Sequence, residues 1–209
     1  MLQVSLSDQN EQRGPAMHFN IKGALIALSC FFILNPCFAQ DNSINEEYKT
    51  YCEATGGTVE SMPASYGTRS GTVQGDSKDF CTFHIDNGFI AIGLATFASD
   101  KPSLGATLIK QLPELSSSSP LFKGAYSNPS LNVCKNLGGA SIGFIASSGG
   151  FVNKLGESDI CVFGDGSMVS GWSLIYMANH RTGYDFVKEK VKAQPLNITI
   201  PSKGRGAKL

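Results

Sequence analysis

The sequence predicts an α+β protein built from two repeated modules, each a helix packed on a small antiparallel β-sheet and stapled by one disulfide. Three observations lead to this prediction. The pattern Cys-x-x-x-Gly-Gly begins at Cys52 and again at Cys134. A Cys-x-Phe pattern follows each of them at a similar interval, beginning at Cys81 and at Cys161. Each copy then continues through an Asp/Gly turn of the kind that joins two antiparallel strands.

Residues 1–39 have the pattern of an export signal. The basic Lys22 precedes an apolar run over residues 23–34, and Ala39 offers a small residue at a cleavage site. The run is shorter than the roughly 20 residues that a membrane-spanning helix needs. Met17 lies just upstream and is an alternative start of translation. We therefore expect residues 1–39 to be a signal peptide and the mature chain to have no transmembrane segment.

Two cysteines inside this signal leave a second mode of export open. Acylation of Cys30 or Cys37 would make the protein a lipoprotein, although Pro36 fits a lipobox poorly and the apolar run continues past Cys30. A cleaved signal explains more of the segment. Either mode gives an exported protein, which we expect in the periplasm, at the outer membrane or released from the cell.

The mature chain keeps four cysteines, an even number that indicates disulfides in an oxidising compartment. Four cysteines allow three pairings. We expect Cys52 to pair with Cys81 and Cys134 with Cys161, because each copy of a duplicated module should carry its own staple. A zinc site is the competing interpretation, but no Cys-x-x-Cys pair occurs in the sequence to hold the ion.

The first module is expected over residues 43–99. Ser43 and Glu46 are spaced as a capping box that starts a helix, and the glycine pair after Cys52 ends it. The most apolar stretch of the mature chain, residues 88–98, predicts a buried strand rather than a membrane-perturbing hairpin. The segments after the helix are a strand, a Gly/Ser/Thr-rich excursion and two further strands, over residues 58–62, 63–78, 80–85 and 89–98.

The second module is expected over residues 128–178. Asn128 is a good N-cap and Pro129 fits the first helical position, so a helix should begin there. The glycine pair after Cys134 ends this helix, as in the first copy. The strands that follow are expected over residues 140–147, 159–163 and 167–176.

The remaining segments connect or follow the modules. Residues 100–127 are expected to form a linker that contains a helix over 104–115. Residues 179–209 are expected to hold an amphipathic helix over 184–192, because apolar residues recur there at helical spacing. The chain then ends in a basic tail, for which a solvated end is the simplest interpretation.

The second module has a distinctive motif: Asn128-Pro129, Cys134 with Lys-Asn-Leu-Gly-Gly after it, Ile-Cys-Val-Phe-Gly-Asp-Gly-Ser around Cys161, and Trp172. This motif resembles a small domain of unknown function in exported bacterial proteins that carry a haemolysin label. The first module is similar but lacks the Asn-Pro start and the Trp. The resemblance implies a type of domain and no activity. Tandem stapled modules also resemble accessory subunits of envelope assemblies, such as the outer-membrane core of type IV secretion machines.

No set of residues in the mature sequence indicates catalysis, a cofactor or a metal ion. His84 and His180 are the only histidines after the signal, and neither has a recognisable base or orienting partner, so both are expected at the surface. Asp86 and Asp165 are expected to serve turns. We therefore expect a protein that is not an enzyme.

The function that remains is binding. We expect a non-enzymatic envelope protein, a structural or accessory subunit whose partners are other envelope proteins and not nucleic acid. Trp172 and Tyr176, expected on the last strand of the second module, are candidate interface anchors. The alternatives are a secreted inhibitor or virulence factor that acts on a macromolecule, and a membrane-active haemolysin.

Overall fold

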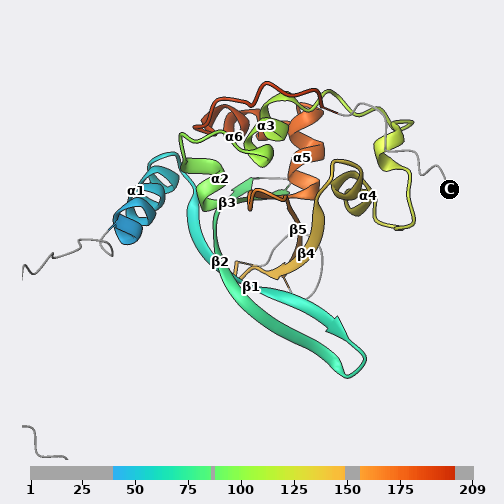
Figure 1. Ribbon diagram of the computed structural model, residues 1–209, viewed down its shortest axis with the longest axis horizontal. Helices are drawn as coiled ribbons and strands as arrows, with labels where there is room; N and C mark the ends of the chain where they lie inside the picture. Colours follow the sequence, from blue (N-terminus) through green and yellow to red (C-terminus); the bar gives the residue numbers. More distant parts are fainter. Residues whose placement is uncertain (1–39, 86–87, 149–155, 201–209) are drawn as a thin grey trace, which may run out of the picture. The chain divides into compact units, whose positions relative to one another are not determined.

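The computed structural model describes residues 40–85, 88–148 and 156–200, which lie within one compact unit. Their central feature is a closed barrel of six strands in the order β1-β2-β3-β6-β5-β4 (Figure 1). The expected signal peptide, the turn at Asp86 and the basic tail from residue 201 lie outside the described residues.

Each half of the chain contributes three consecutive strands to the barrel, and all neighbouring strands are antiparallel. The two halves meet at two seams, where Ile92 pairs with Val169 and Ala64 pairs with Phe144. The strands are β1 (Thr58–Thr68), β2 (Gly71–Ile85), β3 (Gly88–Gly93), β4 (Ala140–Ile145), β5 (Glu157–Val162) and β6 (Met168–Ser170).

The prediction of two separate helix-on-sheet modules is therefore wrong. A three-stranded sheet has two unpaired edges, and each edge is a row of N–H and C=O groups without partners. Joining two such sheets edge to edge pairs those groups and encloses one apolar face of both sheets in a barrel. The two copies seen in the sequence build a single barrel.

Side chains from both halves fill the interior of the barrel. Alternate residues of a strand point to one face, which accounts for the inward set. The rings of Phe80 and Phe144, one from each half, lie 5.1 Å apart and edge to face. The buried inward set is Met62, Ala64, Phe80, Phe89, Ala91, Phe144, Ala146 and Ile160. The two halves thus share one core inside the barrel.

Helices cover the outside of the barrel and form a second apolar core with the outward faces of the strands. Figure 1 shows α3, α5 and α6 side by side on one side of the barrel. The helices are α1 (Gln40–Ala54), α2 (Leu94–Ala98), α3 (Leu104–Gln111), α4 (Pro129–Asn136), α5 (Gly171–Ala178) and α6 (Tyr184–Lys190), with a short 3₁₀ helix, η1 (Pro120–Phe122).

Two segments expected to be strands are strands only at their beginning. The first ends at Gly93, where α2 follows, and the second ends at Ser170, where α5 follows. The Ser170 hydroxyl accepts a hydrogen bond from the N–H of Ser173 and so caps α5. Both segments are apolar almost throughout, and a continuous apolar run does not distinguish a strand from a buried helix.

Three other local predictions concern residues 63–78 and the starts of the helices α4 and α1. Residues 63–78, expected to be an excursion, form the paired outer parts of β1 and β2. The helix α4 begins as expected, because the Asn128 side chain accepts a hydrogen bond from the N–H of Ser130 at 3.1 Å. The helix α1 begins at Gln40, upstream of the capping box expected at Ser43.

Candidate functional site

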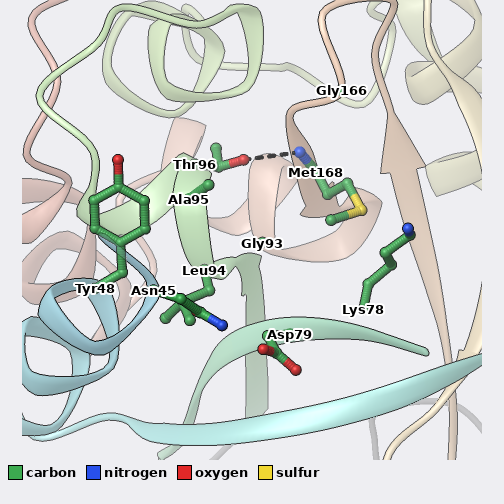
Figure 2. Close-up of a pocket in the computed structure, with 10 residues that line it drawn as sticks. All are labelled: Asn45, Tyr48, Lys78, Asp79, Gly93, Leu94, Ala95, Thr96, Gly166 and Met168. Atoms are coloured by element: carbon green, nitrogen blue, oxygen red, sulfur yellow. Dashed lines mark hydrogen bonds between the residues drawn. The ribbon is translucent and has the colours of Figure 1, made fainter. Parts of the chain in front are cut away.

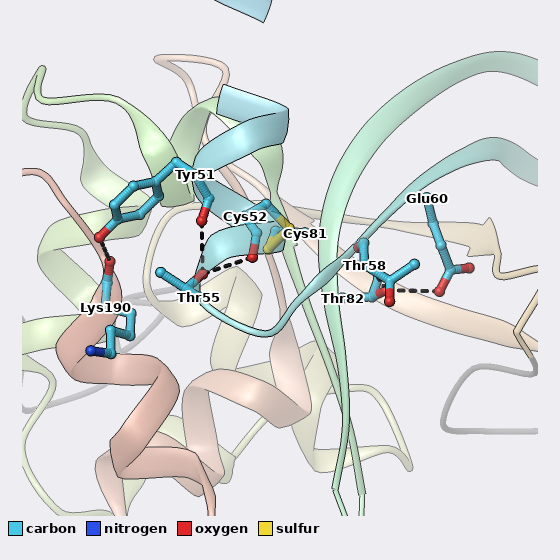
Figure 3. The surroundings of a disulfide bond; sticks show 8 residues. All are labelled: Tyr51, Cys52, Thr55, Thr58, Glu60, Cys81, Thr82 and Lys190. Carbon is cyan, nitrogen blue, oxygen red and sulfur yellow. Dashed lines mark hydrogen bonds between the residues drawn. A yellow bond between two sulfur atoms is a disulfide. The ribbon is translucent and has the colours of Figure 1, made fainter. Parts of the chain in front are cut away.

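Each half carries one buried disulfide at the same place. Cys52 of α1 is joined to Cys81 of β2 (Figure 3), and Cys134 of α4 is joined to Cys161 of β5. These are the two pairs that the repeat predicts. Each bridge ties a helix to the middle strand of its own three-stranded meander, so the four cysteines have a structural role.

The two glycines of each pair have different roles. Gly56 and Gly138 have φ of 87° and 90°, the left-handed conformation that ends a helix without steric cost only for glycine. Gly57 and Gly139 lie flat against the disulfides. A Cβ atom on Gly57 would be 2.6 Å from the sulfur of Cys81, too close for any side chain. The sequence indicates the first role, whereas the second depends on the folded position of the disulfide.

The two histidines do not form a common site. His84 is exposed on β2, with its ring 5.0 Å from that of Phe89. His180 is exposed after α5 and lies 3.0 Å from Asp185, measured from Nδ1 to Oδ1. Within the described residues, no group of three or more His, Cys, Asp or Glu side chains is placed to hold a metal ion.

The two predicted interface residues lie on a helix instead of a strand. Trp172 and Tyr176 are one turn apart on α5, with ring centroids 5.4 Å apart and planes inclined by 25°. Tyr184 of α6 and the guanidinium of Arg181 extend this stack. Burial raises the pKa of Tyr184 to about 12. Trp172 and Tyr176 are half-buried and pack against the core, so much of their surface serves the fold.

Asp165 does more than form its turn. Its carboxylate accepts a hydrogen bond from the N–H of Leu104 at 2.6 Å, and the hydroxyl of Ser167 accepts one from the N–H of Gly105 at 2.8 Å. A turn of the second half thus caps α3 of the first half. Burial by itself raises the pKa of Asp165, but hydrogen bonds from Ser167 and Leu104 outweigh it and hold the pKa below its ordinary value.

Glu60 makes a second contact between the halves. It is an inward residue of β1 and is only 6% exposed. Its carboxylate accepts hydrogen bonds from the hydroxyls of Thr82 at 2.7 Å and of Ser148 and Ser147 at 2.5 and 3.2 Å. Burial raises the pKa of this carboxyl, and the hydrogen bonds outweigh burial and lower it. The sequence does not indicate this site, because Ser147 and Ser148 follow β4 and lie 87 and 88 residues after Glu60 in the chain.

The hairpin of β1 and β2 extends well beyond the barrel (Figure 1). In its outer part, pairing joins Ser65 to Gln74 and Thr68 to Gly71, and residues 66–78 are exposed. Tyr66 and Val73 form a direct cross-strand pair and are 47% and 52% exposed. An exposed aromatic and an exposed β-branched residue side by side form a small apolar spot on an otherwise polar arm.

A hollow lies at the base of this hairpin, where β3 gives way to α2 (Figure 2). Its volume is about 360 Å³. The polar side chains of Asn45, Lys78 and Asp79 and the apolar side chains of Leu94 and Met168 line it. The arrangement offers a cation, an anion and an amide beside an apolar wall, which suits a small polar ligand better than a chemical step.

No family model, curated protein or solved structure matches this chain. The resemblance to the domain with a haemolysin label therefore stays a prediction. None of the described helices has both the length and the apolar character that crossing a membrane requires. The described fold is thus a disulfide-stapled six-stranded barrel with an extended hairpin and one lined hollow at its base.

Proposed function

We propose that this protein is a non-enzymatic, exported subunit of a cell-envelope assembly and that it binds another envelope protein through the β1–β2 hairpin. Two features support export. Residues 1–39 have the pattern of a signal, and the mature chain holds two disulfides, which persist in oxidising compartments. The binding role depends on the hairpin.

The single observation that carries the proposal is the free edge of the outer hairpin. The strand β3 pairs with β2 only from Phe80 to Ile85, so residues 71–79 have no strand neighbour on that side in the described structure. A two-stranded ribbon is marginally stable in water, and an exposed edge readily accepts a further strand. An extended segment of a partner added to this edge would complete a three-stranded sheet.

The side chains of the hairpin give such an edge some selectivity. The ring of Tyr66 lies over Gly75, where an added Cβ would be 2.7 Å from the ring. Tyr66 and Val73 therefore present their apolar surface together on one face of the ribbon. An aromatic anchor beside a strand edge is typical of protein-binding surfaces.

The test is to shorten the hairpin without disturbing the barrel. Ser65 and Gln74 are cross-strand partners, so an Asn-Gly turn can replace residues 66–73. Envelopes from cells with the native chain should yield a cross-linked complex with another envelope protein, and the shortened variant should lose it while keeping both disulfides. The control is Tyr126→Ser, which removes a ring that is also 47% exposed but lies elsewhere. Recovery of the native chain only as a free monomer, or an unchanged complex with the shortened hairpin, contradicts the proposal.

A further inference from the structure

The hollow at the base of the hairpin exists because one strand stops early. The last residue of β3, Gly93, pairs with Phe80, and the chain then turns into α2. The two residues of β2 before Phe80, Lys78 and Asp79, therefore face a space of about 360 Å³ and not another strand. Cavities that hold small molecules start at about this size.

Three polar side chains around this space are not engaged with one another in the part of the chain that the structure describes. Within the described residues, no hydrogen bond or ion pair is made by the side chains of Asn45, Lys78 or Asp79. Figure 2 shows the Lys78 ammonium and the Asp79 carboxylate pointing in different directions, as expected for adjacent residues of a strand. Lys49, which pairs with Glu46 at 2.9 Å, is close enough for Asp79 to add to the rise in its pKa.

The second half has an aspartate at the equivalent position, with a different partner. Asp159 stands two residues before Cys161, as Asp79 stands two residues before Cys81. The Asn128 amide donates a hydrogen bond to Asp159 at 2.9 Å, so this carboxylate has a protein partner.

The residue that begins the helix after the third strand also differs between the halves. A Cβ atom on Gly171, the first residue of α5, would lie 3.1 Å from Ser130, so α4 packs directly on α5. The helix α1 likewise packs on α2, but the first residue of α2 is Leu94, and Leu94 and Tyr48 of α1 line the hollow. The first half thus has Leu94 beside the hollow at the position where the second half has Gly171.

We propose that this hollow binds a short peptide with free ends, its carboxylate toward Lys78 and its amine toward Asp79. A ligand with a single charge would leave the other side chain facing it without compensation, whereas a zwitterion offers a partner to both. The apolar wall of Leu94 and Met168 suits small apolar side chains. The site lies on the barrel, so this proposal goes beyond binding by the hairpin and does not rest on it.

Isothermal titration calorimetry of the mature native protein tests the proposal, with trialanine as the probe. Two further peptides, N-acetyl-trialanine and trialanine amide, each remove one end charge. We expect saturable binding of trialanine with a Kd of about 1 mM or tighter and at least tenfold weaker binding of both blocked peptides. The absence of saturable binding, or equal affinity for all three peptides, overturns the proposal.

Variants assign the two ends. Lys78→Met should weaken binding of trialanine at least tenfold and abolish the preference over its amide, and Asp79→Asn should do the same for the N-acetyl form. Ala95→Phe fills the hollow from an exposed position and should abolish binding of all three peptides. Lys123→Met removes an exposed lysine outside the hollow and serves as the control. Normal binding by Lys78→Met contradicts the assignment. The shortened-hairpin variant should bind trialanine normally, which separates this test from that of the hairpin.

Discussion

The two halves of the barrel share their order of elements and differ in what they leave open. Each half has a helix, three strands and two further helices, with a disulfide at the same place. The strands β1 and β2 have 11 and 15 residues, whereas β4 and β5 have 6 each. Asp79 of the first half faces the hollow beside Leu94, whereas Asp159 of the second half accepts a hydrogen bond from the Asn128 amide. The shared residues thus build the barrel, and the candidate binding surfaces lie where the halves differ.

The halves are nevertheless parts of one structure. Besides the caps on α3 and the hydrogen bonds from Ser147 and Ser148 to Glu60, the Thr96 hydroxyl of α2 accepts a hydrogen bond from the N–H of Met168 at 2.9 Å. Each of these contacts joins the first half to the second. A variant that weakens one half should therefore weaken the other as well.

Removal of a disulfide should have the largest effect. Each bridge closes a loop of 29 or 27 residues, which stabilises the fold by about 3–4 kcal/mol in the chain-entropy description. We expect the double variants Cys52→Ala/Cys81→Ala and Cys134→Ala/Cys161→Ala to lower the midpoint of one common urea transition. Fluorescence of Trp172 and far-ultraviolet circular dichroism should report the same midpoint in both. If the midpoint of the Trp172 fluorescence transition is unchanged in Cys52→Ala/Cys81→Ala, the two halves unfold separately.

The second glycine of each pair should come next. Gly57→Ala places a Cβ 2.6 Å from the sulfur of Cys81, and Gly139→Ala brings one against the sulfur of Cys161. Overpacking of this kind costs roughly 1–3 kcal/mol. Gly67→Ala is the matched control, since a Cβ there meets nothing within 4 Å, and it should change the free energy of unfolding by less than about 0.5 kcal/mol. A loss at only one of Gly57 and Gly139 would break the equivalence of the two disulfide sites, and an equal loss at Gly67 would rule out the approach to sulfur as its cause.

The cap that crosses between the halves should have a moderate effect. Asp165→Ala removes an acceptor for the N–H of Leu104, and loss of such a cap costs about 1 kcal/mol at pH 7. Because the pKa of Asp165 is lowered in the fold, this stabilisation is complete above the unfolded value near 4 and disappears as the pH falls through the folded value. Urea unfolding at pH 7 and at about pH 2 should show the difference shrinking. Asp76→Ala, on the exposed hairpin, should have no effect, and an equal loss there would remove the special role of Asp165.

Substitution of the two equivalent aspartates, Asp159 and Asp79, should give the smallest effect. Burial, and then the charge of Glu157, raise the pKa of Asp159. The ionised form is therefore disfavoured in the fold, and stability falls as the pH rises from the unfolded pKa to the raised folded pKa. Asp159→Asn should stabilise the protein by about 0.5 kcal/mol at pH 7 and leave it unchanged near pH 3. Asp79→Asn should leave the thermal unfolding midpoint unchanged at pH 7 and at pH 3. An equal gain in stability from Asp79→Asn and Asp159→Asn would contradict the difference between the two positions.

Local features of the fold could be predicted, and distant ones could not. The start of α4 at Asn128 and the helix stops at Gly56 and Gly138 follow from residues within one turn of each other. The seams of the barrel join Ala64 to Phe144 and Ile92 to Val169, pairs that no local spacing connects. The apolar run through Gly93 and α2 gave the wrong element, because burial on all sides removes the periodicity that separates helix from strand.

The candidate sites show the same limit. Trp172 and Tyr176 are conspicuous in the sequence, yet they are half-buried on a helix. The exposed edge of β2 could not be predicted, because the Gly, Ser and Thr content of residues 63–78 is typical of a loop. The hollow depends on the point where β3 stops relative to β2, which is a matter of register between strands and helices.

By itself, the sequence determined the disulfide pairs, the helix ends at Gly56 and Gly138 and the repetition, since each of these depends on residues close together in the chain or on the duplication itself. Only the tertiary structure decided that the two copies close into one barrel, because unpaired strand edges and apolar sheet faces are satisfied only by the other copy. It also decided that Asp165 caps a helix of the other half and that Asn128 donates a hydrogen bond to Asp159, while Asp79 faces the hollow beside Leu94.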